Sequence, residues 1–290
     1  MNNKLNEYIG IINSYLENSI PCCSFGEEIV HDAMKYSLSV GGKRIRPVLT
    51  LEFCRLCSGD IDKALPFAAA LEMVHTYSLI HDDLPCMDDD DMRRGMPSCH
   101  IKFGEEYALL AGDGLLTRAF GIIAESKAPA ESIVKAVALL SELAGANGMI
   151  GGQVVDLKNE GKACSIETLE TMDSLKTGAL IKCAALLGVV AAGGSAEQYQ
   201  AAGEYASNLG HAFQIVDDIL DVLGDEKLLG KPVGSDKESD KSTYVSVLGL
   251  EKSQEYAQEI TNKAITALDS FNGDTQFLRE LAVSLLKRNN

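Results

Sequence analysis

Two clusters of aspartates are the residues of this chain whose type and spacing are best suited to chemistry. Residues 81–91 read His-Asp-Asp-Leu-Pro-Cys-Met-Asp-Asp-Asp-Asp, and residues 217–221 read Asp-Asp-Ile-Leu-Asp. Carboxylates crowded this closely repel one another unless water or cations neutralise them. Mg²⁺ prefers oxygen ligands and usually takes one or two carboxylates, completing its shell with water and phosphate oxygens. The two clusters therefore predict a Mg²⁺ site for a substrate that carries several phosphates.

The second cluster is the harder one to explain as ordinary surface. An acidic run is usually a solvated face or a loop. Here the acids lie within the largely apolar segment 209–223. On a helix, Asp217 and Asp221 would share one face with their Cβ atoms about 5–6 Å apart, and Asp218 is the next residue round. Acids among branched apolar residues are costly without a function, so the pattern favours a metal role.

Cationic residues recur close to the functional segments. Residues 41–47, Gly-Gly-Lys-Arg-Ile-Arg-Pro, place three cations between two expected helices, and Arg93-Arg94 follow the first aspartate run. Arginine offers a planar fork that matches phosphate oxygens, and lysine offers a point charge. Each group alone is equally consistent with a basic helix end or a surface charge. Their recurrence favours an anionic substrate, and three further lysines follow the second cluster: Lys231, Lys237 and Lys241.

The elements that must position these residues are predicted to be helices. Apolar residues recur at helical spacing, and no segment shows a convincing strand alternation, so the expected fold class is all-α. Pro85 should end or kink the helix that leads into the first aspartate run. The 290 residues contain no Pro/Ser/Gly-rich linker, and we expect one domain, 1–290. The expected helices cover residues 27–40, 47–57, 61 to the late seventies, 108–126, 130–144, 166–193 with a break at 176–178, 196–223 as one helix or two, 251–268 and 276–288.

Composition excludes some classes of function. The net charge of −16 argues against nucleic acid as the general partner. The N-terminus lacks the charged-then-apolar pattern of a signal peptide. The longest apolar stretch, residues 183–192, is about half the length of a membrane span. The eight cysteines, without a signal peptide, are expected to be thiols. We therefore expect a cytoplasmic protein with no nucleic-acid partner and no membrane span.

A series of motifs, in a fixed order, carries a family resemblance. Besides 41–47 and the two aspartate clusters, the chain contains Glu-Met-Val-His-Thr-Tyr-Ser-Leu-Ile at 72–80, Gly-Gly-Gln-Val-Val-Asp at 151–156 and Lys-Thr-Gly at 176–178. Arg-Arg-Gly, Phe-Gln and Gly-Lys complete the series at 93–95, 213–214 and 230–231. Over about residues 41–248 the chain resembles the bacterial farnesyl-diphosphate-synthase branch of the trans-isoprenyl diphosphate (polyprenyl) synthases.

The resemblance implies a large antiparallel helical bundle around a deep central cavity, assembled as a homodimer. It also implies a prenyltransferase that condenses isopentenyl diphosphate with dimethylallyl or geranyl diphosphate to give farnesyl diphosphate. Mg²⁺, in several ions, would be the cofactor. Its ligands would be Asp82 and Asp88 on one wall and Asp217 on the other, with Asp83 and Asp218 completing the two catalytic motifs.

The resemblance also assigns roles to the cations and to two polar residues. Arg93, Lys176, Lys231 and Lys241 would bind the allylic diphosphate. Lys43, Arg46, His75 and Arg94 would bind isopentenyl diphosphate. Thr177 and Gln214 would face the carbon that becomes cationic. Without the resemblance, His75 would be read as a hydrogen-bonded core histidine.

We expect product length to depend on Tyr77, which lies five residues before Asp82. On an ideal helix this spacing moves Tyr77 about 7.5 Å along the axis and about 140° around it. Helix geometry alone therefore does not decide whether Tyr77 contacts the growing hydrocarbon chain. The alternative is that Tyr77 is an ordinary core residue. The resemblance implies that its ring is the floor that stops growth at fifteen carbons.

Three other functions remain open. A geranylgeranyl diphosphate synthase would differ only in product length. A terpene cyclase needs no second diphosphate site, which would make Lys43, Arg46 and Arg94 superfluous. A non-catalytic partner subunit would be expected to lose acids from one cluster, whereas both clusters are retained here. Turnover of the five-carbon diphosphates with Mg²⁺ separates these possibilities.

Overall fold

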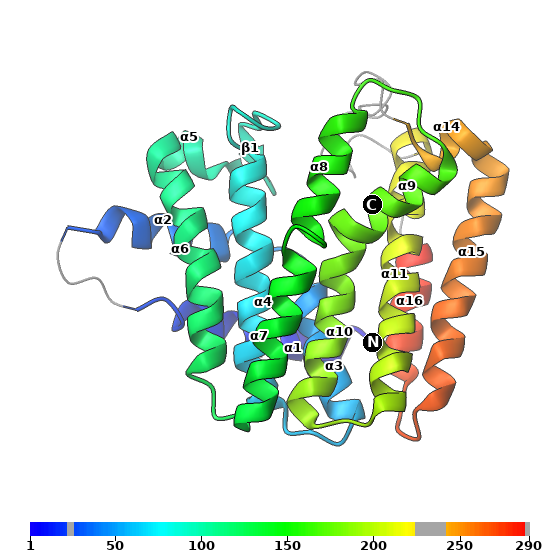
Figure 1. The fold of residues 1–290 in the computed structure, drawn as a ribbon, viewed down its shortest axis with the longest axis horizontal. Coiled ribbons are helices and arrows are strands. Elements are labelled where there is room, and N and C mark those ends of the chain that lie inside the picture. The colour runs from blue at the N-terminus through cyan, green and yellow to red at the C-terminus, as the bar shows by residue number, and fades with distance from the viewer. Residues whose placement is uncertain (22–25, 224–241, 288–290) are drawn as a thin grey trace.

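The protein is a bundle of long helices (Figure 1). The computed structural model describes residues 1–21, 26–223 and 242–287. A hairpin of two-residue strands, β1 (Met92–Arg93) and β2 (Met96–Pro97), is the exception to the all-α prediction, which is otherwise confirmed. The helices are α1 (Asn2–Glu17), α2 (Glu28–Ser39), α3 (Ile45–Leu56), α4 (Ile61–Asp82), α5 (Cys99–Phe103), α6 (Glu105–Ala124), α7 (Ala130–Ala144), α8 (Met149–Asn159), α9 (Ile166–Asp173), α10 (Ala179–Ala192), α11 (Ala196–Leu223), α14 (Tyr244–Leu248), α15 (Leu250–Ala267) and α16 (Gln276–Leu286).

Helix α4 lies at the centre of the bundle. Its N-cap, Asp60, accepts a hydrogen bond from the backbone of Asp62 (3.1 Å). Most of its side chains between residues 64 and 80 are buried because α3, α6 and α10 pack around it. A helix enclosed on all sides reads as nearly uniformly apolar, which is what this segment shows. The helix ends at Asp82, so Pro85 lies just beyond it, as predicted.

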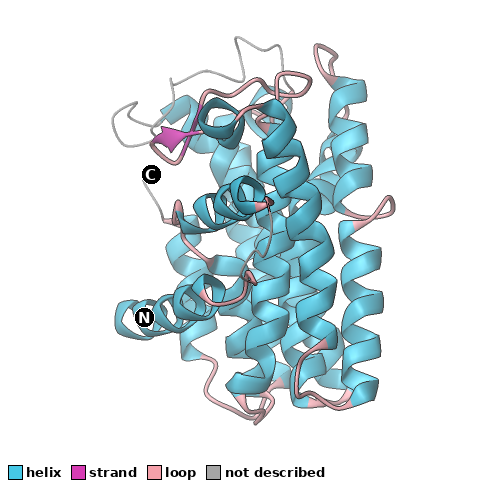
Figure 2. Cartoon of the chain, turned by 90° about the vertical axis from the view of Figure 1, so that its left-hand side faces the viewer, coloured by secondary structure: helices cyan, strands magenta, loops and turns pink. Residues whose placement is uncertain are grey.

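The helix directions bring the two aspartate clusters to one end of the bundle. The C-terminal ends of α4 and α11 lie at the same end as β1, α8 and α14 (Figure 1). The view in Figure 2 shows the short strand at this end, with the long helices running away from it. Under this end, α9, α11, α14 and α15 share a small apolar core of their own around Leu169, Ile215 and Tyr244.

The predicted break in the helix at 166–193 takes a specific form. Residues Ser174–Gly178 make a π-helical turn between α9 and α10. Such turns are rare and frequently mark functional sites. Helix α11 is continuous from Ala196 to Leu223. Among the described helices, α1, α5, α8 and α14 were not predicted, and α5 and α14 are only five residues long.

Within the described part of the chain, three helical stretches are long and apolar enough to cross a membrane, judged by length and composition alone. They are Glu105–Ala124, Ala130–Asn159 and Ile166–Ala192. All three are longer than the uninterrupted apolar run 183–192, from which no membrane span was predicted. Within Ile166–Ala192, 67% of the apolar window is buried in the bundle, against 39% and 33% for the other two. The absence of a membrane span therefore stays a prediction.

Candidate diphosphate and metal site

The first aspartate cluster is organised by the end of α4 and the hairpin that follows. The backbone N–H of Asp88 donates to the carbonyl of Asp82 (2.8 Å), so the chain folds Asp88 back beside the helix end. Asp83 is buried, and its carboxylate accepts from Nε of Arg93 (2.9 Å) and from Nη2 of the same guanidinium. Arg93 also lies 3.2 Å from Asp90. Asp83, the second of the two acids that begin the motif, is therefore held in an ion pair with Arg93.

The charge on Asp82 is costly in the absence of a cation. The pKa of Asp82 is raised to about 6, chiefly by burial, with Lys176 acting to lower it and Asp88 acting to raise it. Among the described residues, no group of three or more His, Cys, Asp or Glu side chains is arranged to hold a metal ion. Asp82 and Asp88 offer two carboxylates on this wall. That donor set fits Mg²⁺, which takes its remaining ligands from water and phosphate.

The second cluster lies on the last turns of α11. Asp217 and Asp218 are half-buried, and Asp221 is only 4% exposed. Oδ2 of Asp218 accepts a hydrogen bond from the backbone N–H of Tyr244 (2.7 Å), the first residue of α14. Asp218 thus also anchors the start of α14.

The π turn brings Lys176 to the first aspartate cluster. Its Nζ lies 2.5 Å from Oδ2 of Asp156 on α8, and it is near enough to Asp82 to lower the pKa of that carboxyl. Helix α11 packs closely on the turn, since a Cβ added to Gly210 would stand 3.0 Å from Cα of Gly178. Lys176 and its neighbour Thr177 are therefore fixed by backbone packing between α8 and α11.

The four residues predicted to bind isopentenyl diphosphate line one cavity of about 370 Å³. They come from the loop before α3, from the first turn of α3, from α4 and from the β hairpin. Three are cationic, and one wall is apolar, with Ile181, Leu209 and Phe213. A cationic cavity with an apolar wall suits a small anion that carries a hydrocarbon part. The four are Lys43, Arg46, His75 and Arg94.

Arg46 and His75 are adjacent in this cavity. Nη1 of Arg46 lies 3.4 Å from Nε2 of His75. Burial, with the nearby charges of Arg46 and Arg94, lowers the pKa of His75 well below its usual value, so the ring is neutral. Nε of Arg46 is buried and has no hydrogen-bond partner within the described parts of the chain. A buried donor without a partner is costly, and a phosphate oxygen would satisfy it.

Arg44 has a different role from its neighbours. Its Nη1 lies 2.6 Å from Oε1 of Glu72, with both side chains 2% exposed, and its Nε donates to Oδ1 of Asn13 (3.0 Å). It also adopts a positive φ of 48°. Arg44 therefore anchors the loop, and Glu72 neutralises it. Sequence reasoning missed this pair because the two residues are 28 positions apart.

A sequence model of the polyprenyl synthetase family matches residues 27–279 of this chain. The chain belongs to the polyprenyl synthetase family. The family resemblance of the motifs is thus confirmed, and the helical bundle is the fold expected for it.

Curated relatives of this polyprenyl synthetase cover nearly its whole length. The chain is 44% identical over 283 residues to a geranylgeranyl diphosphate synthase of Cyanophora paradoxa, covering 97% of this chain and 94% of that one. It is 42% identical over 284 residues to the farnesyl diphosphate synthase of Escherichia coli K12, with 96% and 95% covered. Among solved structures, an apo FPP/GFPP synthase from Zymomonas mobilis superposes with a TM-score of 0.88 at 32% identity, covering 98% of each chain. These relatives are named for different product lengths.

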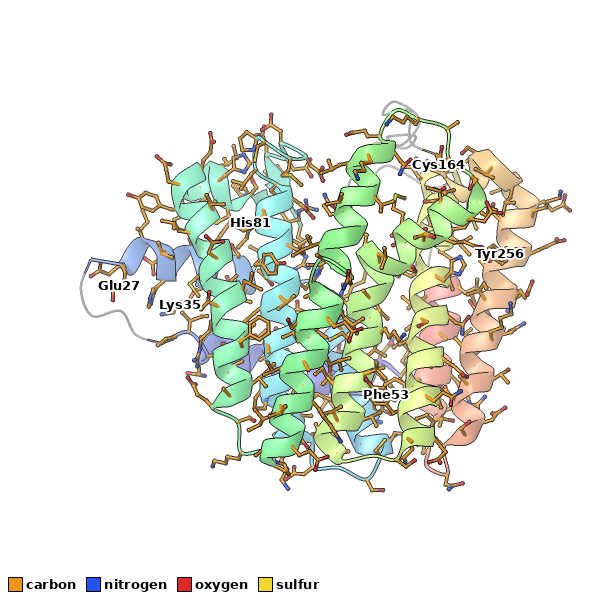
Figure 3. The ribbon with its side chains drawn as sticks, in the orientation of Figure 1. Glu27, Lys35, Phe53, His81, Cys164 and Tyr256 are labelled. Carbon is orange, nitrogen blue, oxygen red and sulfur yellow. The ribbon has the colours of Figure 1, made fainter. Side chains whose placement is uncertain are left out.

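Tyr77 of this polyprenyl synthetase is buried within the bundle, at 5% exposure. Its ring meets the ring of His81 edge-on, with centroids 5.6 Å apart. His81 in turn lies between α4 and α6, where its Nε2 is 3.1 Å from the carbonyl of Leu109 (Figure 3). The Tyr77 hydroxyl is buried without a hydrogen-bond partner in the described structure. The ring is therefore held firmly, while its hydroxyl contributes nothing to that hold.

Two predicted site residues, Lys231 and Lys241, lie outside the described residues. The polar partners that sequence reasoning missed are Glu72, Asp173 and Tyr244. Asp156 ends the 151–156 motif, so a signal for it was present, but its contact with Lys176 was not foreseeable from spacing.

Proposed function

We propose that this prenyltransferase condenses isopentenyl diphosphate with dimethylallyl and then geranyl diphosphate, and releases farnesyl diphosphate. The observation that carries the proposal is the cavity lined by Lys43, Arg46, His75 and Arg94. It supplies an anion site in addition to the aspartate wall at Asp82. Chain elongation needs two diphosphate sites, whereas a cyclase that ionises one diphosphate needs only one.

The aspartate walls and the π turn would hold the allylic diphosphate. Asp82, Asp88 and Asp217 would bind Mg²⁺, which supplies charge neutralisation for the departing diphosphate. Lys176 adds a fixed positive charge to the same place, since it already acts on the pKa of Asp82. Arg93 would contribute through its exposed edge. Fixed charges aimed at the leaving group are commonly the largest catalytic term.

Cleavage of the allylic C–O bond sends its electron pair to the diphosphate and leaves a delocalised carbocation. Thr177 and Gln214 would turn their oxygens toward that cation. The π electrons of isopentenyl diphosphate then form the new C–C bond, and the proton lost passes to the released diphosphate. His75 is an unsuitable base, because it lies among cations that keep basic groups from gaining a proton.

Product length rests on the ring of Tyr77. A buried aromatic held against His81 would block a tail that grows along α4 beyond fifteen carbons. The similarity to a geranylgeranyl diphosphate synthase supports a second candidate, in which growth continues to twenty carbons.

We further propose a homodimer that forms through α5 and α6. Helix α6 lies at an outer edge of the bundle (Figure 1). Large apolar side chains are exposed on these two helices: Ile101 at 52%, Tyr107 at 39%, Leu109 at 47% and Leu110 at 50%. A second copy of the chain would cover them. We also propose that the protein is located in the cytoplasm.

Product analysis tests the proposed function. Purified protein is incubated with Mg²⁺, isopentenyl diphosphate and dimethylallyl diphosphate, and the products are separated by chain length. A linear fifteen-carbon diphosphate is expected, and a chelator should abolish it until Mg²⁺ is restored. A twenty-carbon diphosphate would favour the second candidate. A hydrocarbon product would indicate a cyclase, and no turnover a non-catalytic subunit.

A further inference from the structure

The basic loop between α2 and α3 has an unusual backbone. Gly41 and Gly42 adopt positive φ angles of 89° and 121°, and Arg44 adopts a φ of 48°. The left-handed region is open to glycine, but an arginine there costs free energy. Contacts from outside the loop must therefore hold Arg44 in place, and its side chain, only 2% exposed, makes them.

The Arg44 guanidinium is held by three separate elements. Its Nη1 lies 2.6 Å from Oε1 of Glu72 on α4, and its Nη2 donates to the carbonyl of Leu38 on α2. Its Nε donates to Oδ1 of Asn13 on α1 (3.0 Å). These contacts use all three nitrogens of the planar guanidinium, so together they fix both its position and its orientation.

Helix α1 is itself fixed to the bundle. The hydroxyl of Tyr8 donates to Oε2 of Glu52 on α3 (2.8 Å), and Nζ of Lys4 lies 2.7 Å from the same oxygen. Glu52 is fully buried. The polyprenyl synthetase model matches from residue 27 onwards, so α1 lies outside the matched segment. Asn13 therefore gives Arg44 a contact on a firmly held helix that the family match does not cover.

The same loop carries or supports the three cations that line the cavity for isopentenyl diphosphate. Lys43 lies in the loop, and Arg46 lies in the first turn of α3 that follows it. Arg94, from the β hairpin, donates to the carbonyl of Gly41 and lies against Gly42, where an added Cβ would stand 2.6 Å from its Cζ. A shift of the loop is therefore expected to move all three cations.

We propose, on the basis of the prenyltransferase function proposed above, that Asn13 is a positioning residue for the isopentenyl diphosphate site and acts through Arg44. Of the described residues that line that site's cavity, none belongs to α1. Asn13 is exposed and lines a second cavity, of about 720 Å³, between α1, α2 and α5. Arg44 borders both cavities. Truncating Asn13 would therefore enlarge the outer cavity and leave the packing of the core unchanged.

Asn13→Ala is the sharpest variant, because it removes one acceptor and keeps every charge. We expect it to raise the KM for isopentenyl diphosphate roughly three- to tenfold, as the loss of one hydrogen bond typically does. Both kcat and the KM for the allylic substrate should stay within about twofold of the wild type. Asn13→Asp keeps an acceptor oxygen for Nε of Arg44 and should restore the KM.

Asn18→Ala is the matched control. Asn18 is also an exposed asparagine of the α1 segment, but its amide donates to the carbonyl of Ser14 in the same helix (2.8 Å). This variant should leave the KM for isopentenyl diphosphate unchanged. An unchanged KM in Asn13→Ala would overturn the proposal. A rise that Asn18→Ala shares, or that Asn13→Asp does not reverse, would also overturn it.

A double-mutant cycle tests the contact itself. Arg44→Lys keeps the charge that neutralises Glu72 but lacks the Nε that meets Asn13. In that background, Asn13→Ala should have no further effect on the KM for isopentenyl diphosphate, because the contact is already lost. Additive effects would show that Asn13 acts by another route and would overturn the proposal. If Arg44→Lys does not fold, the variants at Asn13 decide alone.

Calorimetric titration with isopentenyl diphosphate alone provides a readout that needs no turnover. The Kd should rise in Asn13→Ala by a factor similar to that of the KM and stay unchanged in Asn18→Ala. An unchanged Kd in Asn13→Ala would refute the positioning role even if turnover falls. A wild type that binds isopentenyl diphosphate without turnover would refute the proposed function alone, since the comparison of Kd values would still stand. A wild type that does not bind it would overturn both.

Discussion

Gly152 of α8 lies directly against the backbone of Lys176. A Cβ added at residue 152 would stand well inside 3.0 Å of the Lys176 nitrogen, a separation that real Cβ atoms essentially never show. Asp156 lies one turn further along the same face of α8 and meets the Lys176 ammonium at 2.5 Å. A single helix face thus provides both the space for the π turn and the partner for its lysine.

Gly152→Ala should therefore displace the π turn. We expect turnover to fall at least about tenfold and the free energy of unfolding to drop by about 1–3 kcal/mol, as overpacking typically costs. Denaturant unfolding and steady-state kinetics measure the two effects. Gly10→Ala is the control, because its Cβ would meet nothing within 4 Å in α1. That variant should be neutral or gain about 0.5–1 kcal/mol. A native rate in Gly152→Ala would contradict the tight packing.

Arg46→Ala should mainly raise the KM for isopentenyl diphosphate, by roughly tenfold or more. The reason is that its buried Nε lacks a hydrogen-bond partner in the described structure and is available to a phosphate oxygen. The KM for the allylic substrate should change little. Lys135→Ala removes an exposed cation on α7 that is paired with Glu131 and should leave both constants unchanged. An equal loss for both substrates would refute a separate second site.

Asp82→Asn should lower turnover by roughly 100-fold, because it removes a charge that Mg²⁺ would meet at the leaving group. Asp217→Asn should act similarly from the opposite wall. The metal-free fold of Asp82→Asn should be no less stable, since burial already disfavours the Asp82 charge. Asp62→Asn, in the first turn at the other end of α4, is the control for kinetics. Near-native turnover of either variant at ordinary Mg²⁺ would show that the wall is misassigned.

Tyr77→Ala should produce twenty-carbon or longer diphosphates while keeping the chemistry intact. Removing the ring opens space along α4 beside His81. Tyr77→Phe is the control. It keeps the ring and removes only a hydroxyl that has no partner among the described residues, so product length should stay at fifteen carbons. Chromatography of the dephosphorylated products measures both. An active Tyr77→Ala enzyme with unchanged products would disprove the floor.

Asp173→Asn should change how stability depends on pH. Burial raises the folded-state pKa of Asp173 from 3.8 to about 6. Ionising Asp173 therefore destabilises the folded protein, a cost that is absent below about pH 4 and complete above about pH 6. The free energy of unfolding of the wild type should therefore fall as pH rises from about 4 to 6, whereas Asp173→Asn, which carries a neutral amide, should not show this fall. The variant should become the more stable of the two by an amount that levels off above pH 6 at roughly 3 kcal/mol at most. Urea unfolding in chelator at pH 5 and pH 7.5 measures the gap, and a gap that narrows at the higher pH would contradict the assignment.

Local sequence determined most of the helices and the identity of the motifs. Helical periodicity and Pro85 placed the end of α4 correctly, because turn chemistry and amphipathic spacing are properties of neighbouring residues. The break at 176–178 was visible in the sequence, but its π form was not. That form depends on α8 and α11 packing against it, as the contacts of Gly152 and Gly210 show.

Tertiary structure alone decided which charges are already paired. In the sequence, Arg44 and Arg46 look equivalent, yet Glu72 lies 2.6 Å from Arg44, whereas Arg46 faces a cavity with His75. Likewise, nothing local distinguishes Asp83, which Arg93 holds, from Asp82 beside it. Ion pairs depend on distances between helices that are far apart in the chain, and burial sets their strength. Spacing along the sequence encodes neither quantity, so the roles of neighbouring charges separate only when the bundle is assembled.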